Sequence, residues 1–157
     1  MTGSLHWLDA QGVEVAIRTW GQLSAPLVVA WHGFARTSID FATLAESLSQ
    51  RYFVIAPDTP GRGLSQWLPA QRYGFDTYCT LAEIILDSYG KNRPTHWIGT
   101  SMGGIIGLLL AERHPSVLQR LVLNDIGPEV PQTALDRIQS YTGVLPEFQT
   151  LQEAEAY

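Results

Sequence analysis

The chain has 157 residues, of which 45% are hydrophobic and 16% charged, and its formal net charge is −5. This composition predicts one soluble globular domain with a hydrophobic core and excludes a disordered chain. The acidic balance argues against nucleic acid or an anionic membrane as a partner, because phosphate binding requires a basic surface.

The first predicted elements alternate between strand and helix. Residues 13–20, VEVAIRTW, alternate partly between apolar and polar side chains, which is typical of an edge or hairpin strand. Residues 27–32 and 52–57 are continuous apolar runs, which predict strands buried on both faces. Between them, residues 38–50 predict a helix that Ser38 caps. Its expected apolar stripe comprises Phe41, Leu44, Ala45 and Leu48.

The same alternation continues along the chain. The next predicted elements are a glycine-rich loop over 58–65, a helix over 77–89 that Asp76 caps and Gly90 ends, a strand over 96–99, a helix over 102–113 and a strand over 120–125. Pro128 and Pro131 then interrupt the pattern, and TLQE at 150–153 predicts a capping box that opens a final helix. The fold class is therefore α/β, with a mostly parallel sheet and helices on both faces.

One serine lies among glycines between the fourth predicted strand, 96–99, and the helix that follows it. Gly99-Thr100-Ser101-Met102-Gly103 matches the pattern G-x-S-x-G. A nucleophile on such a sharp strand-to-helix turn requires small neighbours, which Gly99 and Gly103 supply. The helix N-terminus after it favours developing negative charge. The alternative interpretation is a glycine-rich turn with a bystander serine.

His32-Gly33-Phe34 follows the first buried strand. An acyl-transfer enzyme needs two N–H donors directed at the oxyanion. We expect one from Met102, directly after the serine, and the other from Phe34, where Gly33 lets the backbone approach a substrate. For His32 itself we favour a structural, hydrogen-bonded role over a catalytic one.

Four motifs in order, WHGF, APDTPGRGLS, GTSMGG and LVLNDIGP, resemble the amino-terminal part of an α/β-hydrolase. They span residues 27–128, and the subgroup that looks most similar contains small carboxylesterases, enol-lactonases and carbon–carbon bond hydrolases. The resemblance implies Ser101 as the nucleophile, with the N–H groups of Phe34 and Met102 as the oxyanion hole. It also implies a cap domain that begins near residue 130.

The base that would activate this serine is missing from the pattern. In the family that the chain resembles, the triad order is Ser, then Asp or Glu, then His. The histidines of the chain are His6, His32, His96 and His114, and none suits the role. We therefore expect a hydrolase core over 1–128, truncated after about the sixth strand, and the start of a helical cap over 129–157. The fragment alone is expected to be inactive.

Asp125 is the one acid in the expected catalytic neighbourhood. It ends the strand after the nucleophile's helix, where some members of the family place the triad acid. We favour the alternative, in which Asn124 and Asp125 cap the following turn. Asp58 is expected to support the loop that contains Gly61 and Gly63, because aspartate readily accepts hydrogen bonds from its own downstream backbone.

Two further residues are candidates for substrate binding. Arg36 follows the oxyanion loop, where it would meet a substrate carboxylate, although a solvated arginine is the favoured interpretation. Trp67 would line an apolar acyl pocket, although aromatic residues at strand ends more often belong to the core or the rim. No His, Cys or Asp cluster has metal-ligand spacing and no phosphate-binding loop is complete, so we expect neither a metal nor a cofactor.

The sequence therefore predicts a serine hydrolase of a small carboxylic ester or lactone that works through an acyl-enzyme. The alternatives are a carbon–carbon bond hydrolase of the same fold and a non-catalytic binding module. The expected partners are the small-molecule substrate and either a missing carboxyl-terminal half or a second copy of the chain. The single cysteine, Cys79, and the absence of a secretory signal or membrane span predict a cytoplasmic protein.

Overall fold

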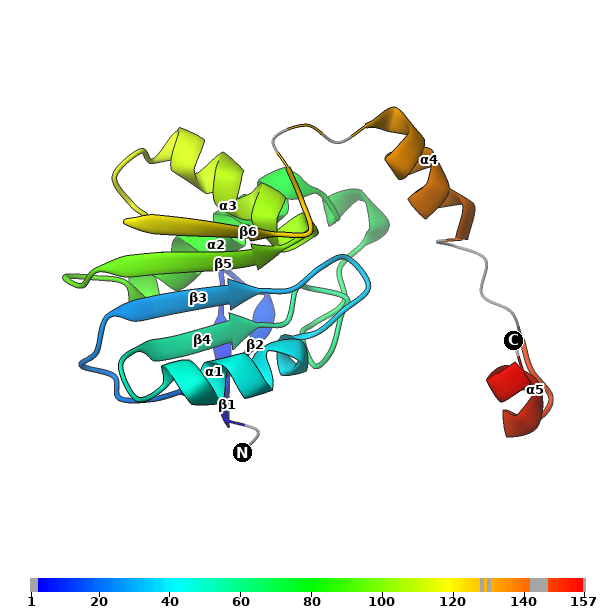
Figure 1. The fold of residues 1–157 in the computed structure, drawn as a ribbon, viewed down its shortest axis with the longest axis horizontal. Helices are drawn as coiled ribbons and strands as arrows, with labels where there is room; N and C mark the ends of the chain where they lie inside the picture. The colour runs from blue at the N-terminus through cyan, green and yellow to red at the C-terminus, as the bar shows by residue number, and fades with distance from the viewer. Residues whose placement is uncertain (1–2, 128, 130, 142–146, 157) are drawn as a thin grey trace. The chain divides into compact units, whose positions relative to one another are not determined.

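Six strands of the chain form one twisted sheet in the order β1-β2-β4-β3-β5-β6 within the part that the computed structural model describes, residues 3–127, 129, 131–141 and 147–156 (Figure 1). The strands are β1 (Ser4–Asp9), β2 (Glu14–Trp20), β3 (Leu27–Trp31), β4 (Phe53–Pro57), β5 (Thr95–Thr100) and β6 (Arg120–Asn124). β3 pairs in parallel with β4 and β5, and β5 with β6, whereas β2 is antiparallel to both β1 and β4. The predicted mostly parallel sheet is confirmed.

Helices cover both faces of the sheet, as predicted (Figure 1). The elements are α1 (Ala42–Leu48), preceded by the 3-10 helix η1 (Ser38–Phe41), then η2 (Ala70–Arg72), α2 (Phe75–Tyr89) and α3 (Met102–Arg113). On one face, Phe41 and Ala45 pack with Val28 and Val54. On the other face, α2 and α3 bury their apolar sides in a larger cluster. There the rings of Trp31 and Trp97 stack with centroids 5.3 Å apart.

The helix predicted over 38–50 begins differently from the expectation. Ser38 does not cap it: the residue is buried, and its N–H donates to the Asp58 carboxylate at 2.7 Å. A carboxylate from the end of β4 thus satisfies one of the free N–H groups at the helix start. Leu44, expected in the buried stripe, is 43% exposed. The short helix therefore buries a narrower face than the sequence predicts.

Asp76 does not cap α2 either. The helix begins at Phe75 with Gly74 as its N-cap, which leaves Asp76 in the first turn. A carboxylate there still interacts favourably with the helix dipole. It also accepts a hydrogen bond from Arg113 of α3 at 2.6 Å. The predicted end of the helix at Gly90 is confirmed.

The chain divides into two compact units, 1–126 and 127–157. The second unit contains α4 (Gln132–Tyr141) and α5 (Leu151–Ala156). The capping box of α5 is confirmed: the Glu153 N–H donates to the Thr150 hydroxyl at 3.2 Å, and the Thr150 N–H donates to the Glu153 carboxylate at 3.3 Å. The sequence pattern does not give the bounds of α4, because Pro131 indicates a break. Proline is compatible with a helix start, and α4 follows it directly.

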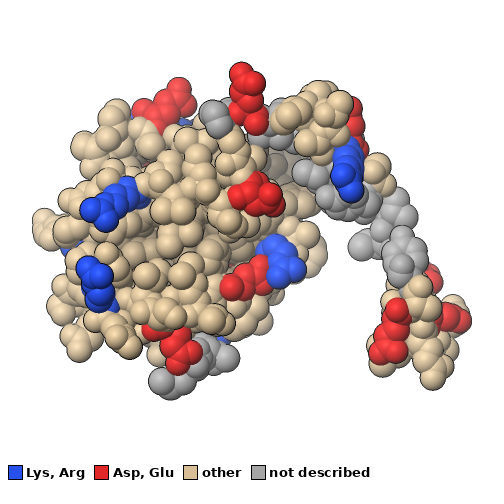
Figure 2. Space-filling model, in the orientation of Figure 1, with Lys and Arg blue, Asp and Glu red and all other residues tan. Residues whose placement is uncertain are grey.

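The surface of the first unit carries scattered charges. On the face shown in Figure 2, acidic and basic side chains lie singly or in pairs within mostly uncharged surface. None of the described helices combines the length and the apolar character that crossing a membrane requires.

Candidate active site

Ser101 occupies the tight turn between β5 and α3. Its backbone has φ 49° and ψ −114°, a conformation that costs an L-residue roughly 1–3 kcal/mol. The Ser101 N–H donates to the Asn124 carbonyl at 2.9 Å, and its carbonyl accepts the N–H groups of Gly104 at 2.8 Å and Ile105 at 3.1 Å. These bonds tie the residue to the end of β6 and to the first turn of α3, so its surroundings fix the strained conformation.

The glycines around Ser101 are required by close backbone contacts. A Cβ at Gly99 would lie 2.3 Å from the Gly103 carbonyl oxygen, and a Cβ at Gly103 would lie 2.1 Å from the Trp31 carbonyl oxygen. A Cβ at Gly104 would meet the Ile126 side chain at 2.5 Å. The predicted need for small residues in this turn is therefore confirmed.

The loop after β3 lies directly beside Ser101. A Cβ built on Gly33 would be 3.6 Å from the Ser101 Cβ, which is ordinary van der Waals contact. The Gly33 carbonyl is a hydrogen-bond acceptor for the His32 ring at 2.7 Å and for the Arg36 N–H at 3.2 Å. In a planar trans peptide the carbonyl and the next N–H point in opposite directions. These bonds therefore also orient the Phe34 N–H.

His32 is buried beneath this loop and has a structural role. Its Nε2 accepts the Thr59 N–H at 2.9 Å, which leaves the ring proton on Nδ1 for the bond to Gly33. The Trp31 indole N–H donates to the Thr59 hydroxyl, which contacts the same Nε2 at 3.1 Å. Burial lowers the pKa of His32 below its ordinary value, with smaller opposing contributions from the hydrogen bond to Gly33 and from Asp58. The ring is therefore neutral and links the loop after β3 to the loop after β4 through its two hydrogen bonds.

Asp58 supports the neighbouring loop as predicted. Its side chain is buried, and it accepts N–H groups from Ser38 at 2.7 Å and from Leu64 at 2.9 Å. A Cβ at Gly63 would lie 2.1 Å from the Asp58 carboxylate. The carboxylate thus fills the space that this glycine leaves open.

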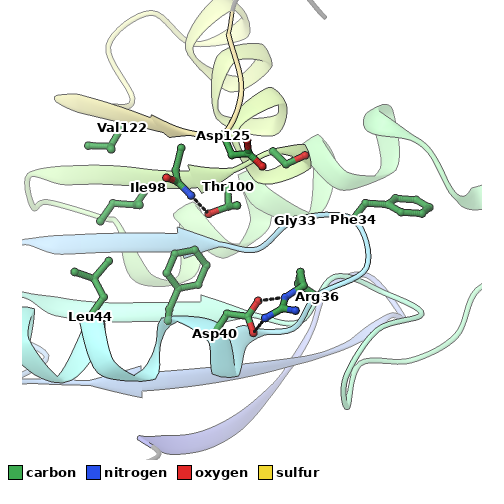
Figure 3. Close-up of a pocket in the computed structure, with 12 residues that line it drawn as sticks. Gly33, Phe34, Arg36, Asp40, Leu44, Ile98, Thr100, Val122 and Asp125 are labelled. Carbon is green, nitrogen blue, oxygen red and sulfur yellow. Dashed lines mark hydrogen bonds and ion pairs between the residues drawn. The ribbon is translucent and has the colours of Figure 1, made fainter. Parts of the chain in front are cut away.

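A pocket of about 860 Å³ opens over Ser101 (Figure 3). Its walls come from the loop after β3, from η1 and α1, and from the ends of β5 and β6. The lining residues are Gly33, Phe34, Arg36, Asp40, Phe41, Leu44, Ile98, Thr100, Ser101, Val122, Asn124 and Asp125. The structure thus brings Ser101, Gly33 and Phe34 of the loop after β3, Arg36 and Asp125 to one cavity, whereas Met102 is not among the residues that line it.

Charged groups line one part of this pocket. Arg36 donates from Nε and Nη2 to both carboxylate oxygens of Asp40, at 2.6 and 3.0 Å (Figure 3). This hydrogen bond raises the pKa of Arg36 above its ordinary value. Arg36 therefore faces the pocket already paired with Asp40.

Asp125, on another wall of the pocket, is exposed and has φ 56°. It directly follows Asn124, whose side chain donates to the Thr100 hydroxyl at 3.2 Å.

Not every aromatic candidate reaches the pocket. Trp67 is 77% exposed and does not belong to the residues that line it. Phe34 lines the rim and is half-exposed, and Figure 3 shows its ring directed away from Ile98 and Thr100. The apolar wall comes instead from Phe41, Leu44, Ile98 and Val122.

All four histidines lie within the described residues, and none is hydrogen-bonded to Ser101. His114 ends α3, whose twelve residues span roughly 18 Å, and it contacts Glu83 at 3.1 Å. His96 is near the start of β5, roughly 16 Å of extended chain before Ser101. His6 contacts Thr19 at 3.1 Å in the β1–β2 hairpin at the far end of the sheet.

Sequence reasoning missed several residues of the site. Asp40 lies four residues after Arg36, a spacing that predicts an ion pair on a helical turn, so a signal for it was present. Leu44, Ile98 and Val122 carried no such signal, because they come from α1, β5 and β6, which only the tertiary fold brings to one pocket.

Comparison with known proteins agrees with this fold. The family model for the alpha/beta hydrolase fold matches residues 26–149. A crystal structure of an alpha/beta hydrolase from Novosphingobium aromaticivorans superposes with a TM-score of 0.88 at 32% identity, covering 99% of this chain and 55% of that one.

Two curated enzymes are also similar. The chain is 39% identical to a 3-hydroxybutyrate-oligomer hydrolase of Cupriavidus necator, over 99% of this chain and 54% of the relative. It is 31% identical to a 2-hydroxy-6-oxo-2,4-heptadienoate hydrolase of Pseudomonas putida, over 85% of this chain and 46% of the relative. The chain thus spans about half the length of the curated relatives it matches.

Proposed function

The chain belongs to the α/β-hydrolase fold family, and from this premise we propose that it is the amino-terminal part of a serine hydrolase of small carboxylic esters or lactones. The observation that carries the proposal is the backbone of Ser101. A serine with φ 49° between β5 and α3 presents its side chain at the carboxyl edge of the sheet, in the pocket wall beside Gly33. A strained conformation held in place this firmly is a mark of functional sites.

In the proposed reaction, the Ser101 hydroxyl attacks the substrate carbonyl while a base takes its proton. The carbonyl oxygen becomes an oxyanion, which the N–H groups of Phe34 and Met102 stabilise. The tetrahedral intermediate then collapses: the base gives its proton to the ester oxygen, the C–O bond to that oxygen breaks to release a hydroxyl group, and an acyl-enzyme remains. Water hydrolyses this acyl-enzyme by the same steps and frees Ser101.

The base is the part of this mechanism that residues 1–157 do not provide. His32 is engaged on both ring nitrogens, and His114 lies a full helix length from the serine. We therefore assign the base to a histidine outside these residues. Asp125 is a candidate for the triad acid, since it follows the strand next to β5 and lines the pocket.

Ester cleavage is favoured over carbon–carbon cleavage by the relative with 39% identity. Oligomers of a hydroxy acid are joined by ester bonds, which the proposed acyl-enzyme route cleaves directly. The 31% identical dienoate hydrolase keeps carbon–carbon cleavage as the second candidate. Product analysis separates them: an ester or lactone yields one acid and one hydroxyl group, whereas carbon–carbon cleavage of a keto acid yields a carboxylic acid and a shorter keto acid.

A fluorophosphonate probe tests the proposal, because it phosphonylates only an activated serine. We expect the protein at its full natural length to be labelled, and Ser101→Ala to abolish labelling. Ser88→Ala, which removes an exposed hydroxyl from α2, is the matched control and is expected to keep full labelling. Labelling that survives in Ser101→Ala, or an unlabelled wild-type protein, contradicts a serine hydrolase and favours a binding module.

A further inference from the structure

Arg62 contacts the oxyanion loop although it lies 28 residues away in sequence. Its Nε donates to the Phe34 carbonyl oxygen at 2.7 Å. Its guanidinium also lies over the Phe34 ring, 4.8 Å from the centroid. Hydrogen bonds from a charged donor are stronger than neutral ones, and a cation over an aromatic ring adds to them. Arg62 thus holds both the backbone and the side chain of Phe34.

The position of Arg62 is itself determined by the core. Its Nη1 donates to the Pro60 carbonyl at 3.0 Å and to the Tyr78 hydroxyl at 3.1 Å. Tyr78 belongs to α2 and is only 5% exposed. The Arg62 N–H also donates to the Thr59 carbonyl at 2.9 Å. The guanidinium therefore connects the buried Tyr78 of α2 to the loop after β3.

Together with the bonds at Gly33, these contacts hold the carbonyl groups on both sides of the Phe34 N–H. The carbonyl of Gly33, before the Phe34 N–H, is held by His32 and by the Arg36 N–H. The carbonyl of Phe34, after it, is held by Arg62. Because Phe34 follows a glycine and its ring is half-exposed, it has little packing of its own to restrict rotation about the backbone.

We propose that Arg62 is a positioning residue for the oxyanion hole: it aligns the Phe34 N–H through the Phe34 carbonyl and ring. The inference rests on the proposed function, since it assigns a cause to the geometry of that site. Arg62 does not belong to the residues that line the pocket, so within the described structure it acts through Phe34 and not on substrate.

The test compares Arg62→Gln with Arg93→Gln in the protein at its full natural length. Arg93 is a matched control, because it also donates to backbone carbonyls, those of Leu23 and Ala25, and lies 5.7 Å from the centroid of an aromatic ring, Phe53. Its partners precede β3 and begin β4, at the opposite edge of the sheet from Ser101. Both variants lose the same kinds of contact.

We measure kcat and KM for p-nitrophenyl butyrate and the inhibition constant of the trifluoromethyl ketone with the same acyl chain. The Ser101 oxygen adds to the ketone carbonyl to form a hemiketal, whose oxyanion occupies the proposed oxyanion hole. In Arg62→Gln we expect kcat to fall about 10- to 100-fold with KM changed less than about threefold, and ketone affinity to fall in proportion. Arg93→Gln is expected to retain wild-type values of all three.

Three results overturn the inference. They are wild-type kcat in Arg62→Gln, an equal loss in both variants, or a loss of kcat without loss of ketone affinity. If Arg62→Gln does not fold, Arg62→Met decides, because it keeps the aliphatic stem but neither the charge nor the donors: lowered kcat at constant KM supports the role, and wild-type kcat refutes it. A wild-type protein that is neither active nor labelled by fluorophosphonate refutes the proposed function itself, which is a separate outcome.

Discussion

The backbone at Ser101 is bent so sharply that its glycine neighbours have no room for a side chain. Gly103→Ala would place a Cβ 2.1 Å from the Trp31 carbonyl oxygen. Trp31 ends β3, and this strand cannot move far enough to relieve the clash. We expect this variant to lose about 3 kcal/mol of unfolding free energy, measured by urea denaturation. Gly74→Ala is the control, since a Cβ there meets nothing within 4 Å, and a loss of similar size in both variants contradicts the account.

The burial of His32 predicts how the free energy of unfolding depends on pH. Burial keeps its folded-state pKa below the ordinary 6.5, so the unfolded chain binds a proton more readily. Unfolding free energy is therefore retained above pH 6.5 and declines as the pH falls below it, with a slope of up to about 1.4 kcal/mol per pH unit from this residue. His96, whose pKa burial also lowers, adds in the same direction.

Urea denaturation between pH 5 and pH 8 measures this slope. We expect His32→Gln to show a shallower decline below pH 6.5 than the wild type. Equal slopes in the two proteins contradict a buried neutral imidazole at this position.

At the residue scale, the sequence predicts what local spacing determines. G-x-S-x-G identifies Ser101 because the turn needs its glycines within two positions on either side. Arg62 was not singled out, because its contact with Phe34 joins two loops that only the parallel pairing of β3 and β4 brings together. A contact that depends on the pairing of distant strands cannot be predicted from the spacing of residues along the sequence.

At the scale of elements, the sequence identifies strands better than helix starts. The apolar runs of β3 and β4 are buried along their whole length, which is the environment that such runs predict. Neither predicted cap is correct, because the Ser38 N–H is satisfied by the Asp58 carboxylate after β4, and Asp76 lies in the first turn of α2 behind its N-cap Gly74. Capping depends on tertiary partners as much as on the residue itself.

Packing of α3 against the sheet is testable in the same terms. Ile106 is fully buried, so Ile106→Ala is expected to cost about 2–5 kcal/mol of unfolding free energy in urea denaturation. Leu23→Ala removes an apolar side chain that is 61% exposed and is expected to cost about 0.5 kcal/mol or less. Comparable losses would show that α3 is not docked as described.

At the scale of the whole molecule, the site lies beside β6, the last strand in the order of the described sheet. β6 pairs with β5 on one side, and no described strand pairs with its other side. Val122 of β6 is 52% exposed and lines the pocket. The assignment of residues 129–157 to the start of a cap, and of the base to a later segment, stays a prediction. Spacing within these residues carries no information about either.

Residues 1–157 expressed alone are expected to show no turnover of p-nitrophenyl butyrate, because no described histidine reaches Ser101. The protein at its full natural length is expected to turn this ester over. Turnover by the shorter chain that Ser101→Ala abolishes, with intact mass excluding any longer species, contradicts the assignment of the base.

The central claim is that Ser101 faces two amide hydrogens prepared to hold an oxyanion. A crystal structure of the fluorophosphonate adduct of the full-length protein tests it most directly. The account predicts phosphorus bonded to the Ser101 Oγ and one phosphoryl oxygen about 2.7–3.1 Å from both the Phe34 and the Met102 backbone nitrogens. An adduct on another residue, or a phosphoryl oxygen turned away from both nitrogens, contradicts the account.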